Sequence, residues 1–320
     1  MLGLGLARSL AKNGVMGINK RNADYVLVYN RRRYYPLVDD KLQTKLLAEK
    51  AGIAIPALYG RIESPHETRL LPRIVEDHRS FVVKPAQGSG GDGIVIVIGR
   101  TGNLFRLADG DHMSVDDLIY HINTILAGTY SLGGQLDKAL IEYRVTSDPL
   151  FDAVSHRGIP DIRIVCFLGV PVMAMVRLPT RMSRGKANLH QGAIGAGISI
   201  DEGRTLTAVW RNNVVSEHPD TEAPVTGLQI PHWDRLLELA ARSYELTHLG
   251  YQGIDIVLDR EKGPLLLELN ARPGLNIQIA NREGLGRRLA LVEANIERLK
   301  SVQDRIFFAR ENFSPNPVSQ

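Results

Sequence analysis

Two apolar segments near the end of the chain restrict the fold more than any other feature. Gly253–Leu258 and Leu265–Asn270 are rich in β-forming residues, and a short polar turn separates them, which predicts a β-hairpin. Glu268 and Asn270 are two residues apart and share a face, and Asp255 should lie opposite Glu268. Acids in apolar strands need a partner, and this oxygen-rich set suits Mg²⁺. The alternative is a surface hairpin whose acids have no role.

Composition sets the class of protein. The chain has 320 residues, 44% of them hydrophobic, which is enough for one large domain or two or three lobes. The net charge of +4 suits a phosphate-bearing or acidic partner without indicating nucleic acid. The one cysteine, Cys166, lies in an apolar run, so we expect a core residue and a reducing cytoplasm. No apolar run reaches the roughly 20 residues that span a bilayer, and we expect no membrane association and no signal peptide.

A glycine-rich segment lies between two further predicted strands. Phe81–Pro85 and Ile94–Ile98 flank Gln87–Gly93, where glycines allow backbone N–H groups to turn toward an anion. No Gly-Lys-Ser/Thr closes the loop as in a Walker A motif, and no helix follows as in a Rossmann turn. We expect a lid that folds over phosphates, with Lys84 at its base. A plain glycine hairpin is the alternative.

Helical spacing of apolar residues predicts helices over 39–51, 67–78, 114–127, 231–248 and 287–310, with a short helix over 4–13. Ser114 and Asp117 have the spacing of a capping box, and Gly250 should cap the helix that ends near His248. Lys41 lies in the first turn of its helix, where a cation opposes the helix dipole, so it is a candidate functional residue. Tyr25–Tyr29 resembles a short strand.

Charged residues stand at the ends of several other apolar segments. Ala139–Val145 reads as a strand that carries Glu142, and Asp161–Arg177 as two strands joined by a Gly-Val-Pro turn. Charges in such places meet ligands or each other. The loop 182–197, with Arg181 just before it, is polar and basic and suits anionic groups; a solvated loop is the alternative.

The order of these segments resembles the ATP-grasp superfamily. It is closest to the RimK-type ligases that add glutamate to protein tails, and to the related glutamate-ligase-like and sugar-transfer-associated ATP-grasp proteins. The resemblance covers roughly 39–286. It rests on Asp40-Lys41, Val83-Lys84-Pro85 with its glycine loop, Ile141-Glu142-Tyr143, Asp161-Ile162-Arg163, Lys186-x-Asn188, Gly253-x-Asp255 and Glu268-Leu269-Asn270-x-x-Pro273-Gly274.

This resemblance implies an α+β fold in which two lobes with antiparallel sheets clamp ATP. We expect a reduced N-terminal segment at 1–38, a small lobe with the lid at 39–140, a large lobe with the metal site at 141–286, and a C-terminal helix and tail at 287–320. The implied activity is an ATP- and Mg²⁺-dependent carboxylate–amine ligase that forms an acyl phosphate. It would add glutamate or a similar amino acid to a peptide or protein.

The resemblance also implies the roles of individual residues. The implied ATP-binding residues are Lys41, Lys84, Gln87, Gly88, Ser89, Gly90, Gly91, Glu142, Tyr143, Asp161, Lys186 and Asn188. Glu142 and Tyr143 would border the adenine, and Asp161 would hold the ribose. Asp255, Glu268 and Asn270 would bind Mg²⁺, with two ions expected and Mn²⁺ as an alternative. Arg163 and Arg272 would steady the acyl phosphate and the tetrahedral intermediate.

Three departures from the ligase pattern leave alternatives open. The N-terminal lobe is missing or reduced, and a partner subunit or a second copy of the chain could replace it, with Arg31–Tyr35 as a candidate contact. An insertion at Thr146–Gly158 makes Asp148 a competing ribose ligand. Lys186 stands where the ligases tend to have arginine, which loses bidentate geometry. An ATP-binding module without ligase activity, regulatory or in a polysaccharide pathway, is the second function, and a basic nucleic-acid-binding protein is the third.

Overall fold

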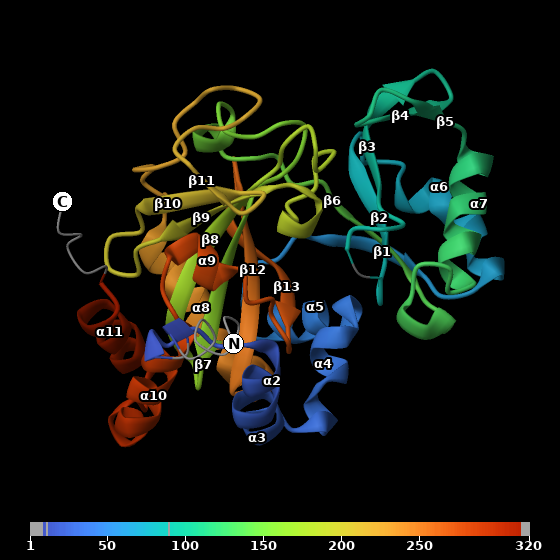
Figure 1. The fold of residues 1–320 in the computed structure, drawn as a ribbon. Helices are drawn as coiled ribbons and strands as arrows, with labels where there is room; N and C mark the ends of the chain where they lie inside the picture. The colour runs from blue at the N-terminus through green and yellow to red at the C-terminus, as the bar shows by residue number, and fades with distance from the viewer. Residues whose placement is uncertain (1–8, 11, 89, 315–320) are drawn as a thin grey trace, which may run out of the picture.

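The chain folds into two lobes that lie side by side (Figure 1). The computed structural model describes residues 9–10, 12–88 and 90–314. Within these residues, the smaller lobe has a six-stranded sheet of order β1-β6-β2-β3-β4-β5, and the larger lobe has a seven-stranded sheet of order β11-β10-β9-β8-β7-β12-β13. Each named strand pair is antiparallel. The predicted α+β class with two antiparallel sheets is confirmed.

The small lobe packs its helices on one face of its sheet. Ser114 caps α7 and forms the predicted capping box with Asp117. Phe81 and Val83 of β2 pack against Ile122 of α7 in a buried core. The elements are β1 (Leu58–Ile62), η3 (Pro65–Leu70), α6 (Leu71–Ile74), β2 (Phe81–Pro85), β3 (Val95–Thr101), β4 (Leu104–Leu107), β5 (His112–Met113), α7 (Val115–Leu126), η4 (Leu132–Gly134) and β6 (Ala139–Tyr143).

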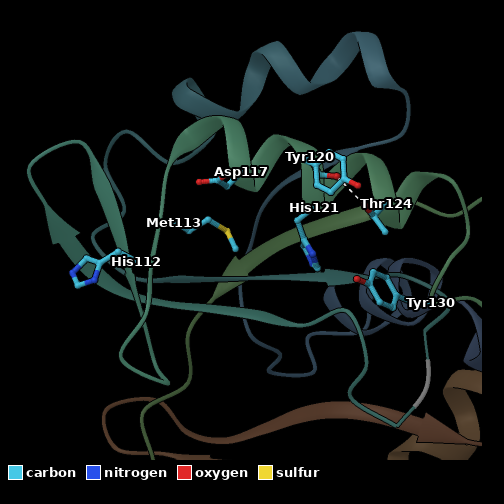
Figure 2. A pocket seen from close by; sticks show the side chains of 7 residues that line it. All are labelled: His112, Met113, Asp117, Tyr120, His121, Thr124 and Tyr130. Carbon is cyan, nitrogen blue, oxygen red and sulfur yellow. Dashed lines mark hydrogen bonds between the residues drawn. The ribbon is translucent and has the colours of Figure 1, made fainter.

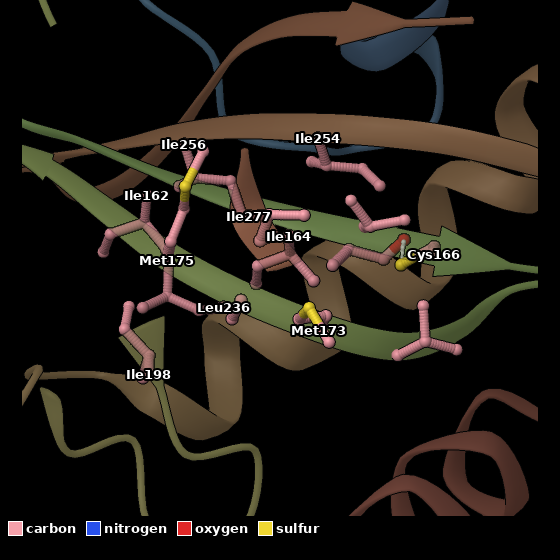
Figure 3. Close-up of a cluster of buried hydrophobic side chains, with 14 of the residues drawn as sticks. Ile162, Ile164, Cys166, Met173, Met175, Ile198, Leu236, Ile254, Ile256 and Ile277 are labelled. Carbon is pink, nitrogen blue, oxygen red and sulfur yellow. Dashed lines mark hydrogen bonds between the residues drawn. The ribbon is translucent and has the colours of Figure 1, made fainter. Parts of the chain in front are cut away.

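The large lobe contains the main core, and Figure 3 shows ten labelled members of it from β7, β8, β9, β12, α8 and α9. Its elements are η5 (Pro149–Phe151), β7 (Asp161–Phe167), β8 (Val170–Leu178), η6 (Leu189–Gln191), β9 (Ile194–Ile198), β10 (Thr205–Trp210), β11 (Asn213–Val215), α8 (Trp233–Thr247), β12 (Tyr251–Asp259), β13 (Gly263–Asn270), α9 (Ile277–Asn281), α10 (Leu285–Asn295), η7 (Ile296–Arg298) and α11 (Val302–Asn312). No helix in the described ranges is long and apolar enough to cross a membrane.

The two faces of the large sheet have different chemistry. Ile164 and Cys166 of β7 lie in the core that α8 covers, and the Cys166 thiol lies 3.5 Å from the carbonyl oxygen of Ala240. Alternation along β7 sends Asp161 and Arg163 to the opposite face. The polar side chains of that face are therefore held by strands whose other face is mainly apolar, with the buried Gln252 of β12 bound to Thr247 there, which is a rigid support for a site.

The N-terminal segment packs on the far end of this polar face. Phe167 of β7 lies edge-to-face against Tyr25 and Tyr29, with ring centroids 5.4 and 4.8 Å apart. The predicted strand at Tyr25–Tyr29 is wrong, because the segment is helical; Tyr25 and Val26 are both buried and Leu27 and Val28 both exposed, which does not follow the alternation of a strand. Tertiary packing of the aromatic rings thus outweighs β-propensity. The elements are α2 (Ile18–Lys20), the π-helix η1 (Arg21–Val26), α3 (Leu27–Tyr29), η2 (Arg32–Tyr34), α4 (Pro36–Asp39) and α5 (Lys41–Lys50).

Several predicted boundaries also change. The predicted division at residue 140 falls inside β6, which pairs with β1 and β2, so we place the division after Tyr143. The predicted C-terminal helix is two helices, because Ser301 caps α11 separately. His248, in a left-handed conformation, caps α8 instead of Gly250. Leu168 and Gly169 turn the chain between β7 and β8.

One predicted helix is divided in the structure, and another lies mostly outside the described residues. The predicted helix at 67–78 divides into η3 and α6, with Pro72 in the first turn of α6 where a proline is tolerated. The predicted helix at 4–13 lies mostly outside the described residues.

Candidate functional site

The hairpin β12–β13 brings the predicted metal ligands together. Asp255 pairs with Glu268 and Gly253 pairs with Asn270, which confirms the predicted register. The amide nitrogen of Asn270 lies 3.3 Å from Oδ2 of Asp255. Glu268 lies on the edge strand β13 and is about one-third exposed, whereas Asp255 of the inner strand β12 is buried. One buried and one accessible carboxylate therefore stand on the same face.

Two arginines donate hydrogen bonds to the buried carboxylate of Asp255. Arg163 of β7 donates Nε and a terminal nitrogen to Asp255 at 2.7 and 2.6 Å. Arg177 of β8 donates to Asp255 at 2.9 Å and forms a bidentate pair with Asp161. The expectation that charges at the strand ends meet each other is thus confirmed for Asp161 and Arg177.

Burial and charge act in opposite directions on these acids. Burial would raise the pKa of Asp255, but the two guanidinium groups outweigh it and hold the pKa below its ordinary value. Burial is the largest influence on Asp161 and raises its pKa despite the contact with Arg177. Asp148, the competing ribose ligand, instead accepts the backbone N–H of Leu150 at 2.9 Å. Each of the two candidate ribose ligands therefore already has a protein partner.

Helix α5 connects the lid to the hairpin. Asp40 caps this helix by accepting the N–H of Leu42 at 2.8 Å, which fixes the position of Lys41. The ammonium of Lys41 donates to the carbonyl oxygen of Gly88 at 2.5 Å and lies 3.5 Å from Glu268. The unfavourable position of this lysine in the helix is thus explained by contacts across the site.

A buried cluster joins Lys84 to Glu142. The Lys84 ammonium lies 2.5 Å from one Glu142 oxygen, and the Lys45 ammonium lies 2.7 Å from the other. All three side chains are almost completely buried. Lys45 was not predicted; its spacing of four residues from Lys41, which places both on one side of α5, is the signal that would have found it.

The glycine loop is anchored at both ends. Asp137, also not predicted, accepts the N–H of Gln87 at 3.1 Å, and the hydroxyl of Ser131 binds the same carboxylate. His121 of α7 lies 2.9 Å from the carbonyl oxygen of Gly93 (Figure 2). Beside this end lies a cavity of about 420 Å³ lined by His112, Met113, Asp117, Tyr120, His121, Thr124 and Tyr130. The loop has well-defined ends and glycines in between.

Positive φ angles explain the glycines of the loop. Gly90, Gly91 and Gly93 have φ of 68°, 79° and 74°, which disfavours other residues. At Gly93 a Cβ atom would lie 2.5 Å from the ring of Tyr130. Ser89 lies outside the described residues.

The basic loop of the large lobe reaches the lid of the small lobe. Lys186 lies 2.9 Å from a carboxylate oxygen of Asp92, and the pair is exposed. An exposed pair of this kind stabilises by about 0–1 kcal/mol, so the contact is weak and reversible. Asn188 accepts the N–H of His190 at 3.0 Å and thereby shapes the loop. The contact of Lys186 with Asp92 thus joins the two lobes.

The hinge between the lobes rests on Tyr143 and Asp259. The Tyr143 hydroxyl donates to Asp259 at 3.1 Å, and the same carboxylate accepts the N–H groups of Thr146, Glu261 and Lys262. Burial is the largest influence on the hydroxyl and, with the Asp259 contact, raises the pKa of Tyr143 to about 12. Burial would raise the pKa of Asp259, but its hydrogen bonds lower it. Asp259 is a hinge residue that was not predicted.

Arg272 lies apart from the buried network. Its guanidinium stacks on the ring of Tyr35, with 4.9 Å between the guanidinium carbon and the ring centroid. Arg33 stacks in the same way on Tyr34 at 4.8 Å. The side chain of Arg272 is exposed, and no ion pair involves it within the residues that the structure describes. The two predicted catalytic arginines therefore have different surroundings, since Arg163 is bound to Asp255.

The donor set fits Mg²⁺ rather than a softer metal. In the part of the chain that the structure describes, no three His, Cys, Asp or Glu side chains are grouped as metal ligands, and the predicted set consists of two carboxylates and the amide of Asn270. Oδ1 of Asp255 accepts one hydrogen bond, from Arg163, and a carboxylate oxygen has a second lone pair. With the accessible carboxylate of Glu268 and the amide oxygen of Asn270, this gives three oxygen donors.

One known protein family matches most of the chain. A model of the family described as sugar-transfer associated ATP-grasp matches residues 20–294. A comparison with curated proteins gave no match.

Solved structures with a similar fold are distant in sequence. They include the ATP-grasp ligase PsnB with its minimal precursor (16% identity, TM-score 0.46, 85% of this chain and 63% of that chain), D-alanine–D-alanine ligase from Bacillus anthracis with ATP (14%, 0.44, 87% and 67%), and a Chryseobacterium gregarium RiPP-associated ATP-grasp ligase with ADP and a leader and core peptide (15%, 0.44, 88% and 68%). The chain thus spans less than two thirds of the length of PsnB.

Proposed function

Because the chain belongs to the family of sugar-transfer associated ATP-grasp proteins, we propose that it is an ATP- and Mg²⁺-dependent carboxylate–amine ligase. The observation that carries this proposal is the position of Lys41. Its ammonium lies 2.5 Å from the lid carbonyl of Gly88 and 3.5 Å from Glu268 of the hairpin. A cation between a glycine loop and an oxygen-ligand set suits a bound triphosphate.

The proposed reaction activates a carboxylate. A carboxylate oxygen attacks the γ-phosphorus of ATP, the bond to the β-phosphate oxygen breaks, and ADP leaves. An amine then attacks the carbonyl carbon of the acyl phosphate, and inorganic phosphate leaves with the electron pair of the C–O bond, while the amine loses a proton. Phosphoryl transfer depends mainly on positioning and charge neutralisation. We assign Lys41, Lys84 and Lys186 to these tasks.

The residues predicted to bind the nucleotide have the following roles in this proposal. Gln87, Gly88, Ser89, Gly90 and Gly91 would cover the phosphates and keep water from the acyl phosphate. Glu142 and Tyr143 would border the adenine, and Asn188, like Lys186, would approach the phosphates. Asp161 or Asp148 would hold the ribose, and either would first have to exchange its present partner.

Mg²⁺ would be held by Asp255, Glu268 and Asn270. When bound it neutralises phosphate charge, and we propose two ions, with Mn²⁺ as an alternative. Arg163 of β7 and Arg177 of β8 would hold Asp255 in place through their hydrogen bonds. Their charges offset those of Asp161 and Asp255, so the buried network is balanced without metal. The accessible Glu268 would then supply most of the charge toward the metal.

Arg163 and Arg272 are the proposed catalytic arginines. A cation beside the carbonyl carbon stabilises the developing oxyanion. Both arginines would steady the acyl phosphate and the tetrahedral intermediate; Arg163 also binds Asp255, whereas Arg272 is exposed. The RimK-type resemblance suggests glutamate or a similar amino acid, added to a peptide or protein. A homo-oligomer or a partner subunit at Arg31–Tyr35 would complete the acceptor wall, and we expect the protein to work in the cytoplasm.

The test is a screen of ADP release with Mg²⁺ and ATP against pairs of amino acids and peptides. We expect release that depends on both an acid and an amine in the wild type and loss of it in Glu268→Ala. Glu261→Ala, an exposed acid in the turn of the same hairpin, is the matched control and should keep activity. Equal ADP release from wild type and Glu268→Ala under every substrate pair would refute both the ligase proposal and the site.

A second candidate is a nucleotide-binding module without ligase activity, regulatory or in a polysaccharide pathway. The observation that favours it is the engagement of both Asp255 oxygens by arginines. It predicts nucleotide binding without ADP release for any substrate pair. Calorimetric binding of ATP beside the same screen separates the two candidates.

A further inference from the structure

We propose that Lys45 is a positioning residue that makes Lys84 available to the phosphates of the nucleotide by taking over the charge of Glu142. The proposal rests on the proposed ATP-binding function and concerns a residue outside the predicted site. Lys45 lies one helical turn after Lys41 on α5. From one helix, the two lysines thus reach the lid and the buried cluster.

The geometry divides Glu142 between two cations. Lys84 lies 2.5 Å from Oε1 and Lys45 lies 2.7 Å from Oε2, and the Lys45 ammonium also donates to the carbonyl oxygen of Pro56 at 2.8 Å. The side chains of Lys45, Lys84 and Glu142 are 6%, 6% and 4% exposed. Two ammonium groups and one carboxylate leave this buried cluster with one uncompensated positive charge, which an incoming phosphate would neutralise.

Lys45 determines what happens when a phosphate attracts Lys84. If Lys84 were the sole counterion, its movement would leave Glu142 as an unpaired buried carboxylate, which is strongly unfavourable. With Lys45 in place, Glu142 keeps one cation and Lys84 can be shared with the nucleotide. Without Lys45, Glu142 would therefore keep the Lys84 ammonium as its counterion and away from the phosphates. With Lys45 in place, Lys84 is available to them.

The protonation of Lys45 is sensitive to its surroundings. Burial is the largest influence and lowers the pKa of Lys45 to about 8, with Glu142 of β6 opposing the shift and Lys84 of β2 adding to it. When Lys45 loses its proton, Lys84 becomes the sole counterion of Glu142. Nucleotide affinity should then fall as the pH rises through this range, while an arginine at the same position would stay charged.

The test is isothermal titration calorimetry of the non-hydrolysable ATP analogue AMP-PNP with Mg²⁺ between about pH 7 and about pH 9.5. Wild type should weaken about tenfold or more above pH 8, the size of one lost charge-assisted hydrogen bond. Lys45→Arg should show no such fall, and Lys45→Met should bind about tenfold or more weakly than wild type at pH 7 and approach the wild-type affinity at the highest pH. Lys50→Met, an exposed lysine of the same helix, should follow wild type.

The outcomes separate this proposal from the proposed function. Identical pH profiles for wild type and Lys45→Arg, or wild-type affinity of a folded Lys45→Met at pH 7, would overturn the role of Lys45 alone. If Lys45→Met does not fold, the pH dependence of AMP-PNP affinity in wild type and in Lys45→Arg still tests the role of Lys45. No binding of the analogue by wild type at any pH would overturn ATP binding itself, and this proposal with it.

Discussion

Replacing Arg177 by methionine should destabilise the large lobe strongly. The Arg177 side chain is 11% exposed and binds both oxygens of Asp161, which is itself 8% exposed. Its removal leaves Asp161 buried without a cation, while Asp255 retains Arg163 at 2.6 Å. Removal of one partner of a buried ion pair costs about 3–5 kcal/mol. We therefore expect the free energy of unfolding of Arg177→Met to fall by about this amount at pH 7.

Urea unfolding followed by tryptophan fluorescence measures this change. The chain has two tryptophans, Trp210 and Trp233, and both lie in the large lobe, so the signal reports that lobe. With an m value of about 3 kcal/mol/M, the midpoint should fall by about 1 M urea or more. The double variant Arg177→Met/Asp161→Leu should recover most of the loss, because no buried charge is then unpaired.

An exposed pair of the same type provides the control. Arg260 and Asp152 lie 3.0 Å apart with side chains 46% and 62% exposed, so Arg260→Met should cost less than about 1 kcal/mol. A loss of less than about 1 kcal/mol in Arg177→Met would refute the reasoning, as would a double variant no more stable than the single one.

Three further predictions concern the lid, the hinge and the core. Gly93→Ala should raise the KM for ATP in ADP-release assays, because φ is 74° and the Cβ atom would meet Tyr130; Gly102→Ala, with positive φ but open space, separates the backbone cost from the clash. Asp259→Asn should lower the free energy of unfolding by about 1–3 kcal/mol in urea titrations at pH 7, since the carboxylate accepts four donors. The folded pKa of Asp259 lies below the ordinary value, so its contribution to the free energy of unfolding is present above about pH 4 and is lost as the pH falls further. If wild type and Asp259→Asn still differed in stability by the same amount at acid pH, this explanation would be contradicted. Cys166 should resist iodoacetamide in the native protein and react after unfolding, because burial raises the pKa of its thiol; rapid native labelling, followed by mass spectrometry, would count against this.

The sequence predicted most accurately where local patterns and tertiary packing agree. The position of the turn between Gly253–Leu258 and Leu265–Asn270 placed Asp255 opposite Glu268, and the structure has this pair. In the structure, alternation along β7 likewise holds Asp161 and Arg163 on one face. The two-lobed α+β fold followed from the order of the segments, and the family match and the two sheets confirm it.

Local pattern failed where a partner far away in the sequence decides the conformation. Tyr25–Tyr29 has the composition of a strand, but its rings pack on Phe167, and this packing selects a helical backbone. The C-terminal helix has continuous helical spacing, yet the capping box of Ser301 and Asp304 restarts it. That capping box is a local signature which the prediction missed, whereas the contact of Tyr25 and Tyr29 with Phe167 has no signature within its own segment.

The same division holds for the site. The sequence by itself determined which residue types are present and which strand faces carry them, because the side-chain period of a strand is a local property. Only the tertiary structure decided their partners: Arg163 and Arg177 around Asp255, Lys45 beside Glu142, and Lys41 between Gly88 and Glu268. Those partnerships join segments tens to hundreds of residues apart, and their charges interact strongly because they are removed together from water.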